Sequence, residues 1–301
     1  MTFVIDSPAG EFVITMSPTI HFVLGQTATG KTARATQLAK EQNGELINCD
    51  SRQVYQHLDI ITGKTDNPPD IPMHLVDIVD PHEIFSAYDF AQLAIRAIRD
   101  TLKRGRCPIV VGGTGNYARM LLYLNPMIVH VLPLSPQTDN LNKQDLQQKL
   151  MKLDIDGYHN LTPSDQENPR RLVRAIQRIE SETREILDPD SPYALANKYH
   201  IEIVILLHKD QEVLTSRIAQ RVDDRLAADA VGECQSLLAK GYVPTDPGLA
   251  TIGYQSVFRY LTGTIDFETM KTEWATKERQ YAKRQKTYLL KYFPGAKVVY
   301  V

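Results

Sequence analysis

The sequence predicts an α/β protein in which a mainly parallel sheet is flanked by helices and carries a small inserted helical subdomain. From Ile20 onward, short apolar segments typical of buried strands alternate with segments of helical period. Such alternation favours a parallel sheet with helices on both faces, because parallel strands need crossover connections that are usually helical. Between residues 125 and 199 the alternation stops, and prolines separate pieces that are mainly helical.

The individual elements follow from these patterns. We expect strands over residues 21–24, 45–49, 108–111, 201–207 and 297–301. We expect helices over residues 33–42, 88–103, 143–153 and 170–183, and another from residue 117. The chain then has four parts: an N-terminal extension over 1–19 with a possible hairpin, a first core part over 20–124, the inserted helical subdomain over 125–199, and a completing core part over 200–301 with a C-terminal basic helix.

Composition restricts the class of protein. The length of 301 residues suits a core domain with a smaller insertion, and the net charge of −2 means that a nucleic acid would be held by local basic patches. The three cysteines lack metal-ligand spacing and suit a reducing compartment. No apolar run approaches membrane-spanning length. We therefore expect a cytoplasmic protein with no membrane partner, and nothing in the sequence demands more than a monomer.

A glycine-rich loop is the strongest functional signal. Residues 25–32, GQTATGKT, fit the phosphate-binding pattern G-x-x-x-x-G-K-[ST] without a mismatch and lie between an expected strand and an expected helix. Backbone N–H groups of such a loop point at phosphate oxygens, Lys31 adds a charge, and the Thr32 hydroxyl can hold Mg²⁺. The predicted sheet is therefore P-loop NTPase-like, although the loop alone does not say whether its ligand is ATP.

Two further polar loops, at residues 50–55 and 112–117, follow expected strands. Ligands of open parallel sheets sit beyond the carboxyl ends of the strands, so both loops should converge on the phosphate loop. Asp50 could ligate Mg²⁺ or accept a proton from a substrate, or it could only cap a following helix. The glycines of the second loop could let the backbone approach a ligand closely, or could form an ordinary tight turn.

Basic residues gather in two clusters outside these loops. One lies along a helical flank at residues 170–178, and the other, at residues 277–286, is interleaved with Tyr281. Such runs are usually solvated helix faces. Two of them with neighbouring aromatic rings suit RNA better, because phosphates take Arg and Lys while unstacked bases take rings.

A row of arginines recurs every fourth residue after the strand at 201–207, at Arg217, Arg221 and Arg225. One of these guanidinium groups could clamp a phosphate. The alternative is simple helix pairing with Asp224 or Asp229.

Taken in order, these motifs resemble one family. The chain has the loop at 25–32, then DSRQVY at 50–55, GGTGNY at 112–117, RLVRAI at 171–176, IGY at 252–254 and RQYAKRQ at 279–285. This ordered set is similar to that of the tRNA dimethylallyltransferases, also called tRNA isopentenyltransferases, of the bacterial type. The resemblance extends from about residue 20 to about residue 293.

The resemblance implies a reaction. The phosphate loop would bind the diphosphate of dimethylallyl diphosphate, not ATP. The dimethylallyl group would pass to N6 of adenosine 37, beside the anticodon of tRNAs that read codons beginning with U, and diphosphate would leave with Mg²⁺. The partners would be a tRNA anticodon stem-loop and dimethylallyl diphosphate. Bases of an anticodon loop can leave their stack at a low free-energy cost.

Residue roles are also implied by the resemblance. Asp50 would be the general base, Thr114 would support it, and Arg221 would neutralise the diphosphate. The diphosphate-binding residues would be Gly25, Gln26, Thr27, Ala28, Thr29, Gly30, Lys31 and Thr32, with Thr32 at the metal. The tRNA-binding residues would be Asp50, Ser51, Arg52, Gln53, Gly115, Arg170, Arg171, Arg174, Gly253, Tyr254, Arg279, Lys283 and Arg284.

The chain departs from the family pattern in three places. Gln26 stands where the pattern has Pro or Ala, and Asn116 stands where it has an apolar residue. The helical segment expected after Leu124 is largely replaced by residues 125–144, so the inserted tRNA-binding subdomain is shortened.

Two other functions remain as alternatives. An adenylate isopentenyltransferase that uses free AMP or ATP would share the loop and Asp50, but it would have little need for the basic clusters. A P-loop small-molecule kinase would show ATP hydrolysis that depends on Lys31.

Overall fold

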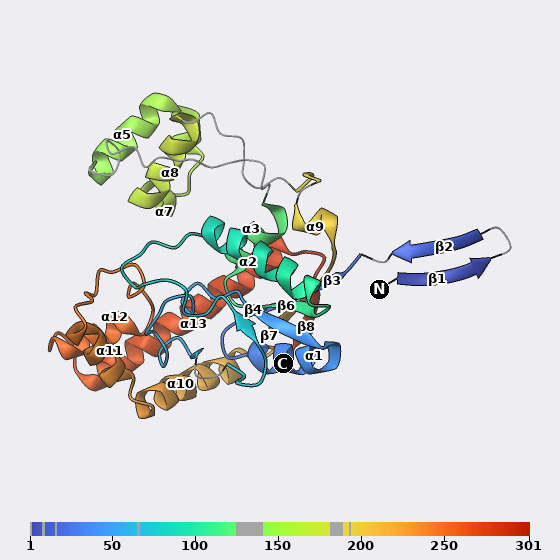
Figure 1. Cartoon of the computed structure of the whole chain (residues 1–301). Helices are drawn as coiled ribbons and strands as arrows, with labels where there is room; N and C mark the ends of the chain where they lie inside the picture. Colours follow the sequence, from blue (N-terminus) through green and yellow to red (C-terminus); the bar gives the residue numbers. More distant parts are fainter. Residues whose placement is uncertain are drawn as a thin grey trace. The chain divides into compact units, whose positions relative to one another are not determined.

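The computed structural model describes residues 2–7, 10–15, 17–64, 67–124, 141–180, 189–192 and 194–301 (Figure 1). Contacts divide the chain into a first unit, Met1–Leu124 with Ala194–Val301, and a second unit, Asn125–Tyr193. The predicted insertion ran to residue 199, whereas the short helix α9 (Leu195–Lys198) falls in the first unit. None of the described helices combines the length and apolar character needed to cross a membrane.

A six-stranded sheet forms the centre of the first unit. Its order is β5 (Met73–His74), β4 (Gly44–Asn48), β6 (Cys107–Gly112), β3 (Thr19–Gly25), β7 (His200–Leu207) and β8 (Lys297–Tyr300), and every neighbouring pair is parallel. The α/β class and the parallel sheet are thus confirmed. A separate two-stranded sheet pairs β1 (Thr2–Ser7) with β2 (Gly10–Thr15) in antiparallel fashion.

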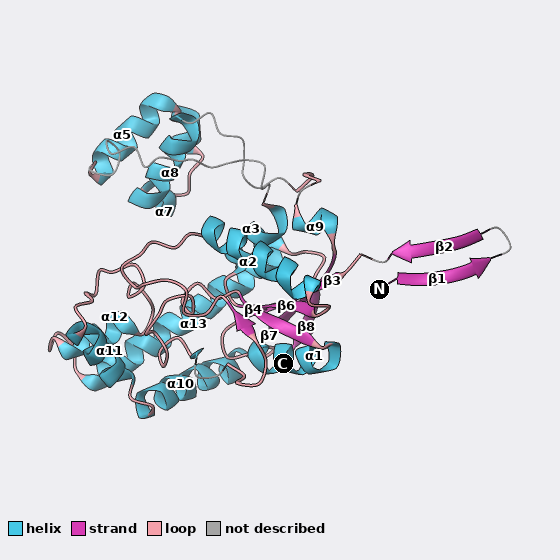
Figure 2. Cartoon of the chain, in the orientation of Figure 1, coloured by secondary structure: helices cyan, strands magenta, loops and turns pink. Residues whose placement is uncertain are grey.

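Helices cover both faces of the large sheet. On one face, α1 (Lys31–Gln42) packs its small residues Ala35 and Ala39 against Val23, Leu46 and Ile109 of three strands. In Figure 2, α2 (Ala87–Lys103) and α3 (Gly115–Tyr123) lie on the other side of the sheet from α1. A capping box between Ser86 and Asp89 starts α2.

A second hydrophobic core lies beyond the sheet. It joins the segment that follows β4 to α10 (Gln211–Ala227), α11 (Ala230–Ala239), α12 (Tyr254–Leu261) and α13 (Phe267–Tyr292). Trp274 and Tyr254 are fully buried in this core. Because α13 also runs back to the sheet, this core fixes the helix that forms one wall of the cavity described below.

The second unit is a small helical body. Its helices are α5 (Lys143–Leu153), α6 (Ile155–His159), α7 (Pro163–Gln166) and α8 (Pro169–Glu180). Leu146 and Leu150 of α5 pack against Leu172 and Ile176 of α8 with an i, i+4 spacing on each helix. This burial orients α8, the helix that carries the first basic cluster.

A buried carboxylate ties down the strand that leads to Asp50. Glu45 of β4 accepts hydrogen bonds from Arg104, His74 and Thr101. The bonds from Arg104 first, and then from His74, lower the pKa of Glu45 to about 2 even though burial opposes ionisation. The ionised side chain therefore stays paired and connects β4, β5 and the end of α2.

Candidate active site

A cavity of about 380 Å³ opens at the carboxyl ends of β3, β4 and β6. It is lined by Lys31 and Thr32 of the phosphate loop, by residues 50–53 after β4, and by residues of α10 and α13. Residues from four distant stretches of sequence therefore meet at the edge where parallel sheets bind ligands.

The phosphate loop is folded for a close approach to an anion. Gly30 adopts a left-handed φ of 75°, and a Cβ atom on Gly25 would lie 2.3 Å from the Leu206 carbonyl oxygen. The loop is also tied internally, because the Thr29 hydroxyl donates to the Gln26 carbonyl over 2.7 Å. Glycine at these positions lets the loop turn tightly between β3 and α1.

Lys31 lies half-buried at the start of α1, and its ammonium donates to the Gln26 carbonyl over 2.5 Å. Burial first, and then the positive charge of Arg221, lower the pKa of Lys31 to about 8, against the opposing influence of Asp50 and Glu278. An incoming diphosphate would replace the single carbonyl and favour the charged ammonium.

Arginines extend the cationic wall of the cavity. Arg221 and Arg225 of α10 and Arg284 of α13 all line it. Arg225 is paired with Glu278 over 3.3 Å, and Arg217, one turn before Arg221, is exposed and outside the lining. The four-residue spacing therefore places two of the three guanidinium groups in the cavity, and the predicted Arg221 is one of them.

Asp50 lines the same cavity from the segment that follows β4. Its Oδ1 accepts the Arg52 N–H over 2.9 Å, and the Asn48 side chain accepts the Asp50 N–H over 3.0 Å. Residues 51–54 form turns, so Asp50 does not cap a helix. No described residue makes a hydrogen bond to its Oδ2 atom, which leaves one carboxylate oxygen for a substrate proton.

Thr114 joins the two polar loops. Its hydroxyl accepts the Ser51 N–H over 3.0 Å, and its own N–H donates to the Cys49 carbonyl over 3.2 Å. Tyr281 of α13 lines the cavity in the neighbourhood of Thr114. Burial and the charge of Asp50 raise the pKa of Tyr281, so the phenol remains a neutral donor beside the carboxylate.

The predicted tRNA-contacting residues divide by location. Ser51, Arg52, Gln53 and Arg284 line the cavity, and Lys283 is exposed nearby on α13. Arg279 is half-buried and donates to the Thr276 hydroxyl over 2.8 Å. Arg170, Arg171 and Arg174 lie on α8 in the second unit, where Arg171 pairs with Asp165. The RNA role of all these residues stays a prediction.

Three predicted contact residues are buried instead of lining the cavity. Tyr254 is fully buried and donates to Glu233 over 2.5 Å. A Cβ atom on Gly253 would meet the Ile61 side chain, and one on Gly115 would meet the ring of Tyr288 at 2.6 Å. The two glycines let neighbouring side chains pack closely, and the Tyr254 ring belongs to the second core. An RNA contact of these three residues stays a prediction.

The structure adds site residues that sequence reasoning missed. Glu278, Tyr281 and Gln285 of α13 line the cavity at i, i+3 and i+7. The helical period of the C-terminal basic run was visible in the sequence, and it could have indicated the shared face of these three residues. It could not have shown that this face meets the phosphate loop.

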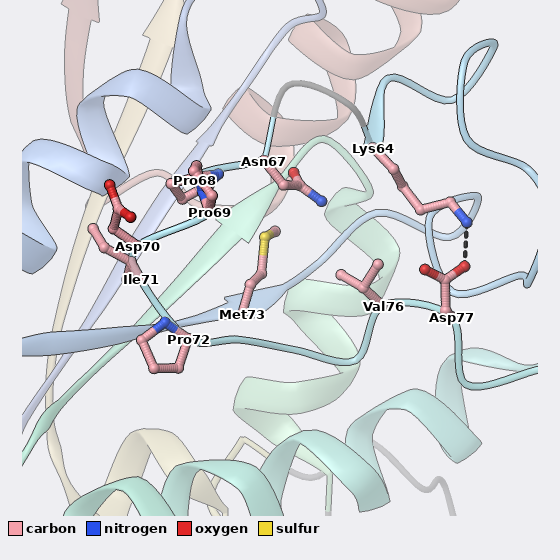
Figure 3. Close-up of a pocket in the computed structure, with 10 residues that line it drawn as sticks. All are labelled: Lys64, Asn67, Pro68, Pro69, Asp70, Ile71, Pro72, Met73, Val76 and Asp77. Atoms are coloured by element: carbon pink, nitrogen blue, oxygen red, sulfur yellow. Dashed lines mark hydrogen bonds and ion pairs between the residues drawn. The ribbon is translucent and has the colours of Figure 1, made fainter.

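A second hollow, of about 580 Å³, lies beside β5 and is lined largely by prolines and by Ile71, Met73 and Val76 (Figure 3). Its lysine, Lys64, is paired with Asp59 and Asp77 and also donates to the Tyr55 carbonyl. Since that ammonium is already neutralised, the hollow is a poor anion site. The cavity at the phosphate loop is therefore the candidate active site.

Comparison with known proteins fixes the family. The IPP transferase family model matches residues 53–292, and the isopentenyl transferase model matches residues 18–68. A tRNA dimethylallyltransferase of an Exiguobacterium species is 35% identical over 91% of this chain and 88% of its own. The chain belongs to the tRNA dimethylallyltransferase family.

Related proteins and solved structures agree with this membership. A tRNA dimethylallyltransferase of Staphylococcus aureus is 34% identical over 90% of this chain and 89% of its own. The crystal structure of a tRNA isopentenylpyrophosphate transferase from Staphylococcus epidermidis is similar with a TM-score of 0.65 and 30% identity, over 94% of this chain and 92% of that one. A eukaryotic dimethylallyltransferase acting on tRNA gives a TM-score of 0.76 at 26% identity, over 94% of this chain and 74% of its own.

Proposed function

We propose that this chain transfers the dimethylallyl group of dimethylallyl diphosphate to N6 of adenosine 37 in tRNAs that read codons beginning with U, and that it releases diphosphate. A tRNA dimethylallyltransferase prenylates a tRNA adenosine, and this is the activity of the family. One observation carries the finer proposal: a single cavity is lined by the phosphate loop, by Arg221 and Arg225, and by Asp50.

The two walls suit the two halves of the reaction. A bond forms between N6 of adenosine and C1 of the dimethylallyl group, and the bond from C1 to the diphosphate oxygen breaks with its electron pair. Lys31, Arg221 and the loop amides stabilise the charge that gathers on the departing diphosphate. The free oxygen of Asp50 takes the proton that N6 loses, and Thr114 holds the Asp50 loop in place.

Magnesium fits the donor set of this cavity. Among the residues that the structure describes, no group of three or more His, Cys, Asp or Glu side chains is placed to bind a metal. Mg²⁺ often takes only one or two protein ligands and completes its shell with phosphate oxygens and water. The Thr32 hydroxyl lines the cavity at the start of α1 and is the residue that would hold it. When bound, Mg²⁺ would neutralise part of the diphosphate charge.

Basic residues that take no part in the transfer step would bind the RNA. Lys283 and Arg284 of α13 are exposed cations next to the cavity, and α8 carries the arginine cluster of the second unit. Together with Arg52 and Gln53, these residues are the proposed contacts to the anticodon stem-loop. We further propose that the protein acts as a monomer in the cytoplasm, where tRNA is available.

A transfer assay tests the function. Labelled dimethylallyl diphosphate and Mg²⁺ are offered to the protein with an anticodon stem-loop RNA in one tube and AMP in another. We expect label in the RNA, and we expect a matched RNA with guanosine at position 37 to remain unlabelled. Label in AMP alone would assign a free-nucleotide enzyme. Hydrolysis of ATP that depends on Lys31, without any transfer, would assign a kinase.

A further inference from the structure

Gln285 of α13 connects the phosphate loop to the loop that carries Thr114. Its Oε1 accepts the Thr27 N–H over 2.8 Å, and its Nε2 donates to the Gly113 carbonyl over 3.0 Å. Gln285 is 5% exposed, and its hydrogen bond to Gly113 is buried while the one from Thr27 is partly buried. A buried amide that uses both ends in this way holds its two partners at a fixed spacing.

The backbone at Gly113 is fitted to this amide. A Cβ atom at position 113 would lie 2.2 Å from Nε2 of Gln285. Gly113 has no positive φ that would by itself require glycine. The absence of a side chain there is therefore explained by the approach of Gln285.

A second buried glutamine anchors the same helix to the phosphate loop. The Nε2 atom of Gln26 donates to the Ala282 carbonyl over 3.1 Å, and its Oε1 accepts the His208 N–H over 3.0 Å. Ala282 and Gln285 are three residues apart on α13, so both anchors lie on one helix face. The phosphate loop is thereby fixed to α13 at two points.

The same helix carries groups for both substrates. Tyr281 contacts the Thr114 side of the cavity, while Glu278 pairs with Arg225 on the cationic side. The proposed RNA contacts Lys283 and Arg284 are on its exposed flank. A change in the position of α13 on RNA binding would therefore reach the phosphate loop through Gln285.

We propose that Gln285 is a positioning residue that couples the two substrate sites: RNA bound at the adenosine side orders the phosphate loop through Gln285, and diphosphate bound at the loop orders the adenosine side in return. The proposal rests on the proposed function, because it takes RNA and diphosphate as the two ligands. If binding of one ligand already orders an element that both ligands must order, the second ligand loses less conformational entropy and binds more tightly. The effect is reciprocal.

The test measures the coupling directly. The affinity of the full-length protein for Mg²⁺–diphosphate is measured by titration calorimetry, with and without a saturating anticodon stem-loop RNA. In the wild-type protein we expect RNA to raise the diphosphate affinity about fivefold or more. In Gln285→Met, which keeps the side-chain length and removes both hydrogen bonds, we expect this ratio to fall toward one.

Three variants make the test specific. Gln285→Glu keeps the acceptor for Thr27 N–H and loses the donor to Gly113, so it should also lose coupling. Gly113→Ala displaces the Gln285 amide from its contact with the backbone at residue 113. Adding Gly113→Ala to Gln285→Met should cause no further loss of coupling. Gln235→Met changes an exposed glutamine of α11 and should keep the wild-type ratio.

The outcomes separate this proposal from the proposed function. Label transfer to the stem-loop by the wild-type protein tests the function alone. A wild-type ratio of one, or an unchanged ratio in a Gln285→Met or Gln285→Glu protein that unfolds at the wild-type temperature, would overturn the coupling role. A purely structural role for Gln285 would weaken diphosphate binding equally with and without RNA, which would also overturn it.

Discussion

The two walls of the cavity are built in different ways. The cationic wall, with Lys31 and Arg221, starts from a local sequence motif and is completed by helices from the C-terminal part of the chain. The wall around Asp50 is held by a network in which Asn48, Thr114 and Arg52 fix the backbone and one carboxylate oxygen. In the proposed reaction, the cationic residues would neutralise the departing diphosphate, and the hydrogen-bond network would hold Asp50 in position to take a proton.

The largest expected effect is at Asp50. Asp50→Asn keeps an acceptor for the Arg52 N–H but cannot take a proton, so we expect the single-turnover rate to fall by about a hundredfold or more. RNA and diphosphate affinities should change little. Asp100→Asn, an exposed change on α2, is the control and should transfer at the wild-type rate. A near-wild-type rate for Asp50→Asn would remove Asp50 from the mechanism.

A smaller but still large effect is expected on the cationic wall. Arg221→Ala should lower kcat/KM for dimethylallyl diphosphate by roughly a hundredfold, because a preorganised cation facing the leaving group is lost. Arg217→Ala on the same helix is exposed and should leave kcat/KM unchanged. If steady-state kinetics gave equal losses for both variants, the effect would be general electrostatics instead of a specific contact.

The pH dependence of KM should identify the contribution of Lys31. Since the pKa of Lys31 is lowered to about 8, its positive charge is present below that pH and is lost as the pH rises above it. We expect KM for dimethylallyl diphosphate to rise by up to about tenfold per pH unit above pH 8. Lys31→Arg keeps its charge, so its KM should be flat from pH 7 to 9. A rise of the same size in Lys31→Arg would assign the pH effect to another group.

The smallest expected effect concerns Thr114. Thr114→Val keeps the shape but leaves the Ser51 N–H without its acceptor, which costs about 1 kcal/mol, or roughly fivefold in kcat. Thr114→Ser retains the hydroxyl and should transfer at nearly the wild-type rate. Equal rates for the valine and serine variants would show that the methyl group, not the hydroxyl, matters at this position.

Sequence patterns predicted the elements whose signals are local. The phosphate loop lies between a buried strand and a helix with small residues on its inner face, and both periodicities are visible without any tertiary information. Asp50 and Thr114 were placed correctly beside that loop, because all three follow strands of one parallel sheet.

Other features depend on contacts that no local pattern encodes. Gln285 meets Thr27 across 258 residues of sequence, and Gln26 meets Ala282 across 256. Tyr254 belongs to a motif that suggested RNA contact, yet its ring fills the second core and its hydroxyl is satisfied by Glu233. In each case the partner, and not the residue type, decides the role, and only the folded chain supplies the partner.

The most direct test of the division between the walls is the binding of Mg²⁺–diphosphate to Asp50→Asn and Arg221→Ala, measured by calorimetry beside their single-turnover prenyl transfer to the anticodon stem-loop. We expect Asp50→Asn to bind diphosphate like the wild type and to transfer almost nothing, and we expect Arg221→Ala to bind diphosphate weakly. Weak diphosphate binding in Asp50→Asn, or wild-type binding in Arg221→Ala, would refute this division of roles.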